Sequence, residues 1–179
     1  TLVIEKSTQF GGTSATSGGG VWIPNNRYAK AENVDDSDQD ARDYINSVSP
    51  EGKIKDELVE TYLSEGPKMI DYLHDNSQVK YRNLAHYPDY FPDNPGGKAG
   101  NRSMEPEPIK GTELGDDLGK LRGQHPQTAF TMGPINMNFT QVEGQLLLGA
   151  LPGWKSQFAK LFTKYILDIP MRFKWGWKD

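Results

Sequence analysis

A run of glycine, serine and threonine near the start of the chain constrains its fold more than any other feature. Residues 11–20 hold five glycines and four serine or threonine side chains, and the apolar Val21-Trp22-Ile23 follows directly. Glycine lets the backbone approach a ligand closely and take positive φ. Successive N–H groups, together with hydroxyls, can bind phosphate oxygens. The run therefore predicts an anion-binding loop, and the alternative is a flexible linker between two strands.

The residues that precede this loop favour a nucleotide as the ligand. Leu2-Val3-Ile4-Glu5 is a short apolar run closed by an acid, which is typical of a buried parallel strand. In dinucleotide-binding folds an acid at the end of the second strand binds a ribose hydroxyl pair. Glu5 stands where that acid would stand, and the G-x-G-x-x-G turn expected before it is absent from the chain.

Residues 3–6 and 10–25 resemble the FAD-binding segment of the 3-ketosteroid Δ1-dehydrogenases, flavoproteins of the fumarate reductase/succinate dehydrogenase superfamily. The Ser-Gly-Gly-Gly-x-Trp-x-Pro continuation is similar to the steroid branch in particular. The resemblance implies FAD as cofactor and an α/β fold: an α-rich, internal fragment of a Rossmann-like FAD-binding domain with a helical insertion, its first βα unit missing. Residues 1–31 would belong to the FAD-binding core. Residues 32–179 would form the helical and loop region that borders the substrate pocket.

The same resemblance implies roles for individual residues. Glu5 would hold the adenosine ribose, and the glycine-rich loop would wrap the pyrophosphate, the ribityl chain and the flavin edge. The implied cofactor-binding residues are Glu5, Lys6, Gly11, Gly12, Thr13, Ser14, Ser17, Gly18, Gly19 and Gly20.

A second motif, Tyr87-Pro88-Asp89-Tyr90-Phe91, is similar to the family's Pro-Asp-Tyr segment. In the family this tyrosine lines the steroid pocket and hydrogen-bonds to the tyrosine that acts as general base, a role that the resemblance gives to Tyr90. Tyr87 is the alternative pocket residue, and a buried structural tyrosine is the alternative for Tyr90. The general base itself is expected beyond Asp179.

The implied activity is that of an FAD-dependent oxidoreductase acting on CH–CH groups. A tyrosinate would take the C2 proton of a 3-keto steroid, and flavin N5 would accept hydride from C1. Two alternatives stay open: another enzyme of the superfamily, acting on an enoate or a Δ4-steroid substrate, and a non-catalytic helical interaction module. The fragment by itself is expected to be inactive.

Composition excludes several other classes of function. A net charge of −4 and a pI of about 5.4 give no basic surface for nucleic acid. The absence of cysteine excludes disulfides, thiolate catalysis and Cys-based metal sites, and His74, His86 and His125 are isolated, so no metal is expected. No apolar run is long enough for a membrane span. A cytoplasmic protein with a small-molecule substrate is expected. The aromatic and basic residues 171–178 suit an internal packing edge, and peripheral membrane association is the alternative for them.

Periodicity and turn residues predict mainly helices. Helices are expected at 38–48 with Ser37 as N-cap, at 54–65, from Pro67 onward, at 139–148 (where a strand is the alternative) and at 154–168. Gly66-Pro67 and Pro170 are expected to break or end helices. The expected inward residues of the second helix are Ile54, Leu58, Val59, Tyr62 and Leu63. Residues 78–102 read as a long binding loop, and residues 103–126 as an extended segment with a short helix and solvated charges.

Overall fold

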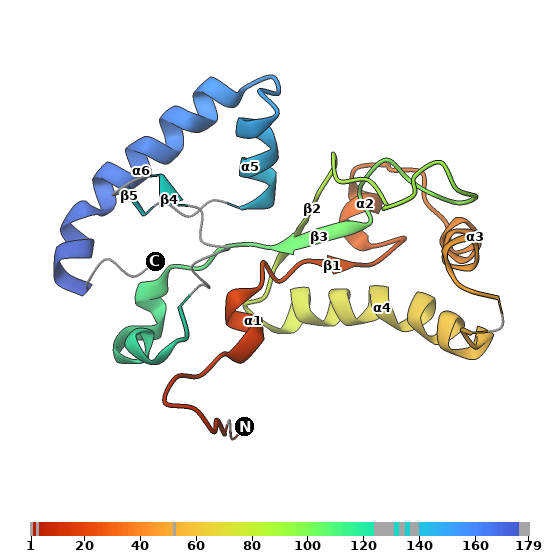
Figure 1. The fold of residues 1–179 in the computed structure, drawn as a ribbon, viewed down its shortest axis with the longest axis horizontal. Coiled ribbons are helices and arrows are strands. Elements are labelled where there is room, and N and C mark those ends of the chain that lie inside the picture. The colour runs from red at the N-terminus through yellow and green to blue at the C-terminus, as the bar shows by residue number, and fades with distance from the viewer. Residues whose placement is uncertain are drawn as a thin grey trace. The chain divides into compact units, whose positions relative to one another are not determined.

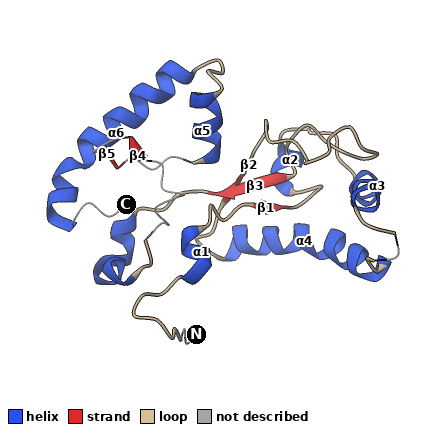
Figure 2. Ribbon diagram, viewed as in Figure 1, coloured by secondary structure: helices blue, strands red, loops and turns tan. Residues whose placement is uncertain are grey.

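The computed structural model describes residues 2, 4–51, 53–123, 131–132, 135–136 and 140–175 (Figure 1). These residues fall into two compact units, one of Thr1–Gly19 with Pro108–Asp179 and the other of Gly20–Glu107. Helices dominate both units and the strands are short, as Figure 2 shows. This agrees with the predicted α-rich character of the chain.

The second unit is built on a small antiparallel sheet that packs against a long helix. Its strands are β1 (Val21–Trp22), β2 (Tyr81–Asn83) and β3 (Ser103–Pro106), in the order β1-β3-β2. The register places Val21 opposite Met104 and Arg82 opposite Glu105. The core comprises Ile23, Ile70 and Met104, with Val21, Tyr28 and Tyr81 packed around it.

One charge that was expected in solvent is buried in this sheet. Glu105 is 3% exposed, and its Oε1 accepts from Arg82 Nε at 2.9 Å and from Arg82 Nη2 at 2.8 Å. The prediction of solvated charges over residues 103–126 was therefore wrong at this position. The cross-strand partner supplies the cation that makes burial of the carboxylate tolerable.

Helices α2 (Arg27–Ala31), α3 (Asp38–Val48) and α4 (Asp56–Asn76) complete the second unit. The Ser37 side chain accepts from Asp40 N at 3.1 Å, which confirms the predicted N-cap of α3. A second core cluster joins α3 and α4 through Ala41, Val59 and Leu63. Ala41 and Ile45 of α3 thus pack against α4, while Val48 near the end of α3 is 40% exposed.

Helix α4 corrects the prediction of two helices separated at Gly66-Pro67. It runs unbroken from Asp56 to Asn76 with Pro67 inside. Proline removes one helical hydrogen bond, but Leu63 and Ile70 on either side are 4% and 0% exposed, and burial at both outweighs the loss. The inward residues are Val59, Leu63, Gly66 and Ile70. Ile54 and Leu58, expected inward, are 45% and 62% exposed, and Tyr62 is 42% exposed.

The first unit contains α1 (Gly12–Thr16), the 3₁₀ segment η1 (Gly111–Lys120), the hairpin β4 (Thr131–Met132) with β5 (Ile135–Asn136), and helices α5 (Gln141–Leu148) and α6 (Trp154–Trp175). Thr140 and Glu143 form a capping box at the start of α5, which confirms a helix there. Part of the predicted segment 139–148, residue 139, lies outside the described residues.

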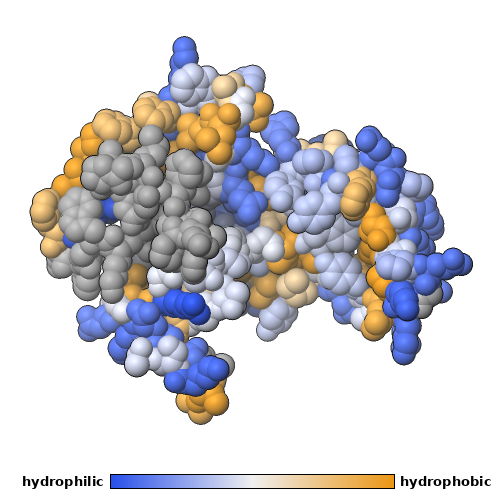
Figure 3. Space-filling model, viewed as in Figure 1, coloured by the Kyte–Doolittle hydropathy of each residue, from blue (hydrophilic) through white to orange (hydrophobic). Residues whose placement is uncertain are grey.

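Helix α6 continues past Pro170, which was expected to end it. Proline has no N–H, so the Ile166 carbonyl, four residues before Pro170, has no helical donor. Both residues are exposed, and water can therefore bind that carbonyl. Among the apolar side chains of α6 from Trp154 to Ile169, only Leu161 is buried, at 4% exposure. Figure 3 shows apolar residues along this helix. None of the described helices is both long enough and apolar enough to cross a bilayer.

The strand expected at residues 2–5 is not formed by the residues that the structure describes there. Leu2 and Ile4 are 86% and 84% exposed, and neither lies in a strand. A parallel strand needs a neighbour to bond its backbone groups, and the sheets of the described residues, β1-β3-β2 and β4-β5, do not include this segment. The nearest strand-like pairing is the single parallel bridge of Phe10 with Leu121.

Candidate functional site

The first half of the glycine-rich run folds into a short helix instead of an open loop. Gly11 and Gly12 have φ of 108° and 52°, and the chain turns through them into α1. A Cβ at Gly11 would stand 2.6 Å from Ala15 Cβ, so this turn requires glycine. The loop expected at residues 13–16 is thus helical, because the two glycines allow the chain to enter a helix at once.

This arrangement leaves backbone donors at the start of α1. Gly11 caps the helix without a side-chain hydrogen bond, and the first helical bond runs from Ala15 N to Gly11 O at 3.0 Å. The N–H groups of the first turn have no helical acceptor. The side chains of Thr13 and Ser14 in that turn are exposed. Backbone and hydroxyl donors therefore face outward from one turn of chain.

The second half of the run is held by a local serine turn. Ser17 Oγ accepts from Gly19 N at 2.8 Å, and Gly19 has φ of 67°. A Cβ at Gly18 would lie 3.3 Å from Gln141 Nε2 on α5. Gly20 begins the second unit, where a Cβ would lie 3.5 Å from Met104 O. The glycines thus allow both the positive φ and the close approach of neighbouring groups.

Glu5 and Lys6 lie on the segment that leads away from α1. Both are exposed, and Glu5 Oε1 accepts from Ser7 N at 2.9 Å. Figure 1 shows this segment running out from α1 as an extended trace. The structure therefore groups Gly11, Gly12, Thr13 and Ser14 in one turn, with Ser17, Gly18 and Gly19 following, but it does not bring Glu5 or Lys6 to them.

The described residues of the first unit fit a dinucleotide in their donor chemistry. The turn into α1 offers backbone N–H groups and hydroxyls of the kind that bind a diphosphate. At Gly12, where φ is 52°, a Cβ would meet no atom within 4 Å, so the backbone there is open to a ligand. No group of three or more acids, histidines or cysteines suited to a metal ion occurs among the residues that the structure describes.

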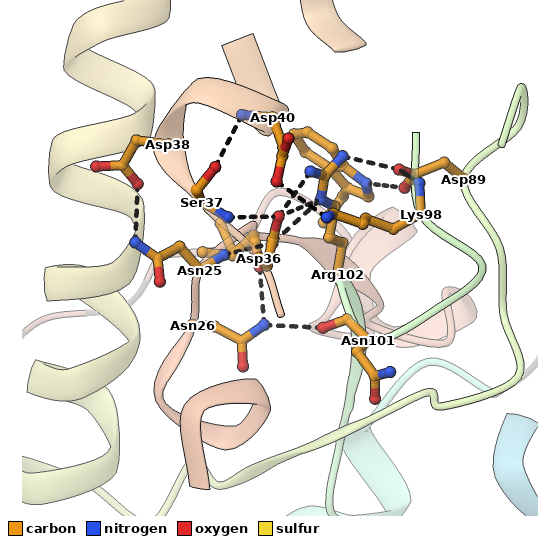
Figure 4. A network of polar contacts seen from close by, with 12 residues as sticks. Asn25, Asn26, Asp36, Ser37, Asp38, Asp40, Asp89, Lys98, Asn101 and Arg102 are labelled. Carbon is orange, nitrogen blue, oxygen red and sulfur yellow. Dashed lines mark hydrogen bonds and ion pairs between the residues drawn. The ribbon is translucent and has the colours of Figure 1, made fainter. Parts of the chain in front are cut away.

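A buried arginine organises the second unit near the end of β1 (Figure 4). Arg102 is 1% exposed; its Nε and Nη2 donate to the Asp36 carboxylate at 2.7 to 3.2 Å, and Nη1 donates to Asp89 Oδ2 at 2.9 Å. The guanidinium also lies over the rings of Trp22 and Tyr44, 5.5 and 5.8 Å from their centroids. A planar guanidinium can serve two carboxylates and two rings at once, whereas a lysine ammonium cannot.

Trp22, two residues beyond the glycine-rich run, is fixed by this network and by α4. Its Nε1 donates to Asp89 Oδ1 at 2.6 Å. The Tyr62 ring stacks on the Trp22 ring with their centroids 6.3 Å apart, and the Tyr62 hydroxyl donates a hydrogen bond to the Trp22 carbonyl oxygen. Partial burial of the Tyr62 hydroxyl raises its pKa above the ordinary value of 10.0.

A second cation, Lys98, joins the same network at the N-terminus of α3 (Figure 4). Lys98 Nζ donates to Asp40 Oδ2 at 2.9 Å, and its backbone N donates to Asp89 Oδ2 at 3.0 Å. The hydrogen bond from Lys98, followed by that with Ser37, lowers the pKa of the Asp40 carboxyl below its ordinary value of 3.8. The three aspartates of the network thus share two cations.

The segment that carries Tyr90 is irregular but closely held. Leu84 O accepts from Tyr87 N at 3.1 Å and from Asn101 N at 3.2 Å, which closes the loop at its base. A Cβ at Gly100 would lie 2.1 Å from Ala85 O, so the two ends of the loop touch backbone to backbone. Within this loop Tyr87 is half-buried and Tyr90 is 85% exposed.

Sequence reasoning missed the charged members of this network. Asp89 lies inside the Pro-Asp-Tyr motif and Arg102 at the end of the predicted binding loop, but only Tyr90, with Tyr87 as its alternative, was given a role there. Asp36 carried no signal, because it precedes the Ser37 N-cap in a run of acids typical of a solvated surface.

Comparison with known proteins gives consistent matches over most of the chain. Residues 1–150 match a family model described as FAD binding domain. A 3-oxosteroid 1-dehydrogenase of Mycolicibacterium smegmatis is 36% identical over 142 residues, which cover 79% of this chain and 25% of that protein. A 4-oxocyclohexanecarboxylate 2-dehydrogenase of Sinomonas cyclohexanicum is 34% identical over 131 residues, covering 73% and 23%. The chain spans about a quarter of the length of these curated relatives.

A solved structure matches the fold as well as the sequence. The 3-ketosteroid Δ1-dehydrogenase of Sterolibacterium denitrificans, crystallised in complex with 1,4-androstadiene-3,17-dione, superposes with a TM-score of 0.85 at 38% identity. The match covers 97% of this chain and 30% of that chain. The arrangement of helices and strands described above is therefore found within a larger protein of known structure.

Proposed function

Because the chain belongs to the FAD-binding domain family, we propose that the protein carrying it is an FAD-dependent dehydrogenase that desaturates C1–C2 of 3-keto steroids. The observation that carries the proposal is the match to the steroid-bound structure over 97% of this chain. The predicted resemblance to the 3-ketosteroid Δ1-dehydrogenases, the fragment of an FAD-binding domain and FAD as cofactor are confirmed by the comparisons.

The turn into α1 is proposed to hold the FAD diphosphate. Backbone N–H groups after Gly11 and Gly12, with the hydroxyls of Thr13, Ser14 and Ser17, would bind its oxygens. The remaining proposed cofactor residues are Lys6, Gly18, Gly19 and Gly20, and Glu5 would hold the adenosine ribose. The role of Glu5 requires its segment to pair with a neighbouring strand. We also propose that the FAD-binding core ends at residue 31 and that the pocket region follows it, a division that rests on the resemblance to the 3-ketosteroid Δ1-dehydrogenases.

Tyr90 is proposed to line the substrate pocket. Its side chain is 85% exposed, so its ring is free to pack on a flat apolar substrate and its hydroxyl to donate or accept a proton. Tyr87, being half-buried, is the second candidate. FAD, when bound, supplies the hydride acceptor. The general base is proposed to lie outside residues 1–179.

A smaller cyclic ketone is the second candidate substrate. The similarity to the 4-oxocyclohexanecarboxylate dehydrogenase favours it, since that relative is nearly as similar as the steroid enzymes. The names of both relatives describe dehydrogenation of a ring that bears an oxo group. The shared chemistry is removal of hydrogen from the α and β carbons of a ring ketone, and the size of the substrate distinguishes the two candidates.

The compartment and the electron acceptor belong to the proposal as well. A cytoplasmic location with an external electron acceptor is proposed, and the aromatic and basic residues 171–178 would support peripheral contact with a membrane. Residues 176–178 lie outside the described part of the chain. Separation of a cell lysate into soluble and membrane fractions, with and without a salt wash, tests this contact.

The cofactor assignment is tested in the whole protein with Ser14→Leu and Gly19→Val. Ser14 is exposed, so a bulky side chain there would block the ligand without disturbing a core, and Gly19 has a φ that valine resists. Gly119→Ala is the matched control, since a Cβ there meets no atom within 4 Å. We expect both variants to lose flavin absorbance and the control to keep it. Full FAD occupancy in both variants would contradict the assignment.

Turnover of the flavin-loaded wild type tests the substrate. A 3-keto steroid and 4-oxocyclohexanecarboxylate are offered with an artificial electron acceptor. We expect the steroid to be dehydrogenated with the higher kcat/KM. Preference for the smaller ketone would favour the second candidate, and oxidation of neither by loaded enzyme would contradict the proposed function.

A further inference from the structure

Tyr90 combines an exposed side chain with a fixed backbone. The residue before it, Asp89, donates its backbone N–H to Lys98 O at 3.0 Å. The residue after it, Phe91, donates its backbone N–H to the Tyr44 hydroxyl at 3.3 Å. An exposed aromatic side chain in a loop normally lies on mobile backbone. Here the backbone is held on both sides, and only the ring of Tyr90 is presented outward.

The strongest of these attachments is the Asp89 carboxylate. Its side chain is 2% exposed and accepts three hydrogen bonds: from Trp22 Nε1 at 2.6 Å, from Arg102 Nη1 at 2.9 Å and from Lys98 N at 3.0 Å. These donors come from β1, from the residue before β3 and from the far side of the loop. A single side chain therefore ties the loop to two strands and closes it on itself.

A fold-only role explains this arrangement incompletely. Burying a carboxylate is costly, and well-packed apolar residues often stabilise a fold equally well. Arg102 already has a complete counter-ion in Asp36, which binds it through Nε and Nη2. What Asp89 adds is a directional link between the Tyr90 loop and Trp22, the tryptophan that follows the glycine-rich run.

We propose that Asp89 and Arg102 are positioning residues: they hold the loop of Tyr90 in the orientation that receives the substrate, and they fix it relative to the end of β1. This inference rests on the proposed function. Without the link, the loop would have to be ordered when substrate binds, and that ordering would weaken binding. The loss would fall on substrate and leave the cofactor unaffected.

Asp89→Asn and Asp36→Asn in the whole protein form a matched pair of variants. Each removes one buried carboxylate from Arg102 and keeps the size of the side chain, but only Asp89 belongs to the Tyr90 loop. Bound FAD, KM and kcat for the steroid, and hydrogen exchange of the backbone amides in residues 85–99 are measured for both. We expect Asp89→Asn to raise KM roughly ten-fold and Asp36→Asn less than about two-fold. FAD content should be equal, and exchange should be faster in Asp89→Asn alone.

Equal KM and equal exchange in the two variants would overturn the inference, because a merely structural role would affect both alike. If the wild type does not oxidise the steroid, the proposed function fails. The inference is then judged on the exchange difference alone.

Trp22→Phe is used if Asp89→Asn does not fold. It keeps an aromatic ring under Arg102, removes the indole N–H that donates to Asp89, and shortens the ring on which Tyr62 stacks. Trp154→Phe on α6 is its control. We expect a smaller rise in KM and faster loop exchange for Trp22→Phe only, and no difference between the two tryptophan variants would overturn the inference.

Discussion

Gly66 on α4 lies against Ile23, the residue that follows β1: a Cβ at position 66 would stand 3.3 Å from Ile23 Cδ1. Both residues are buried, and Ile70, one turn further along α4, is in the same core. The helix approaches the end of the strand through the one position of this turn that has no side chain. Glycine is therefore used here for close packing, although it lies beside a proline and resembles a break.

This contact predicts different outcomes for two substitutions at position 66. Gly66→Ala gains about 1 kcal/mol of helix propensity, which offsets the small displacement that Ile23 must make. Gly66→Val overpacks the contact and is expected to lower the free energy of unfolding by about 1–3 kcal/mol. Urea denaturation of the whole protein, followed by helical circular dichroism, measures both. The same change at exposed Gly119 is the control, and a Gly66→Val variant as stable as Gly66→Ala would contradict the close contact.

Local signals predicted the helices that carry their own start residues. Ser37 before α3 was predicted as the N-cap and satisfies a backbone group three residues on; the Thr140–Glu143 capping box before α5 is equally local, but residues 139–148 were predicted as a helix with a strand as the alternative, without use of this box. The prediction that helices end at Pro67 and Pro170 was wrong, because the cause here is not local to the sequence. Whether a proline ends a helix depends on burial and hydration of the neighbouring turns, and those are properties of distant residues.

In the candidate site, too, features with a local cause could be predicted from the sequence, and features that depend on distant residues could not. The conformation of Gly11, Gly12 and Gly19 could be anticipated, since positive φ is a property of glycine itself. The burial of Arg102 could not, because its partners Asp36 and Asp89 are 66 and 13 residues away in sequence. Charged residues have no periodic pattern that distinguishes a buried pair from a solvated one.

Asn26 provides a sharp test of the turn after β1. It is fully buried, and its Oδ1 accepts from Tyr28 N and Ala29 N at 3.0 Å, which caps α2. Its Nδ2 donates to the Ile23 and Asn101 carbonyl oxygens at 2.9 and 3.0 Å. All four hydrogen-bonding positions of the amide are therefore used.

Asn26→Asp keeps the shape and the cap but places an oxygen against two carbonyls. A buried, unpaired charged acceptor is costly, and we expect a loss of about 3 kcal/mol or more in the free energy of unfolding. Asn33→Asp, at an exposed position, should change it by less than about 0.5 kcal/mol. Equal stability of the two variants, measured by urea denaturation, would show that the Asn26 amide does not face these carbonyls.

Removal of the Arg102 guanidinium should destabilise the protein far more than removal of a surface cation. Arg102→Ala leaves Asp36 and Asp89 buried without their cation, which is expected to cost about 3–5 kcal/mol. Arg42 pairs with Glu60 at side-chain exposures of 31% and 53%, so Arg42→Ala should cost less than about 1 kcal/mol. Arg102→Lys keeps the charge but not the planar fork, and it should fall between them. Melting temperatures of the whole protein give this order, and similar values for the two alanine variants would contradict it.

The ion pair of Asp40 and Lys98 predicts a pH dependence on the acid side. The Lys98 hydrogen bond is the main cause that lowers the pKa of Asp40 in the folded state, and Arg102 adds a weaker attraction. A lowered folded pKa means that the carboxylate stabilises the fold above the ordinary value of 3.8, and that this stability is lost as pH falls through the folded pKa.

Wild type should therefore exceed Asp40→Asn in stability at neutral pH, and the gap should close below about pH 4. Because the side chain of Asp40 is 38% exposed, salt should narrow the gap. In a Lys98→Met background, Asp40→Asn should have a smaller effect with a weaker pH dependence, because only the hydrogen bond with Ser37 and the attraction of Arg102 still lower the pKa of Asp40. Melting curves from pH 7 to pH 3 measure all four proteins, and a gap that persists undiminished at the acid end would contradict the pairing.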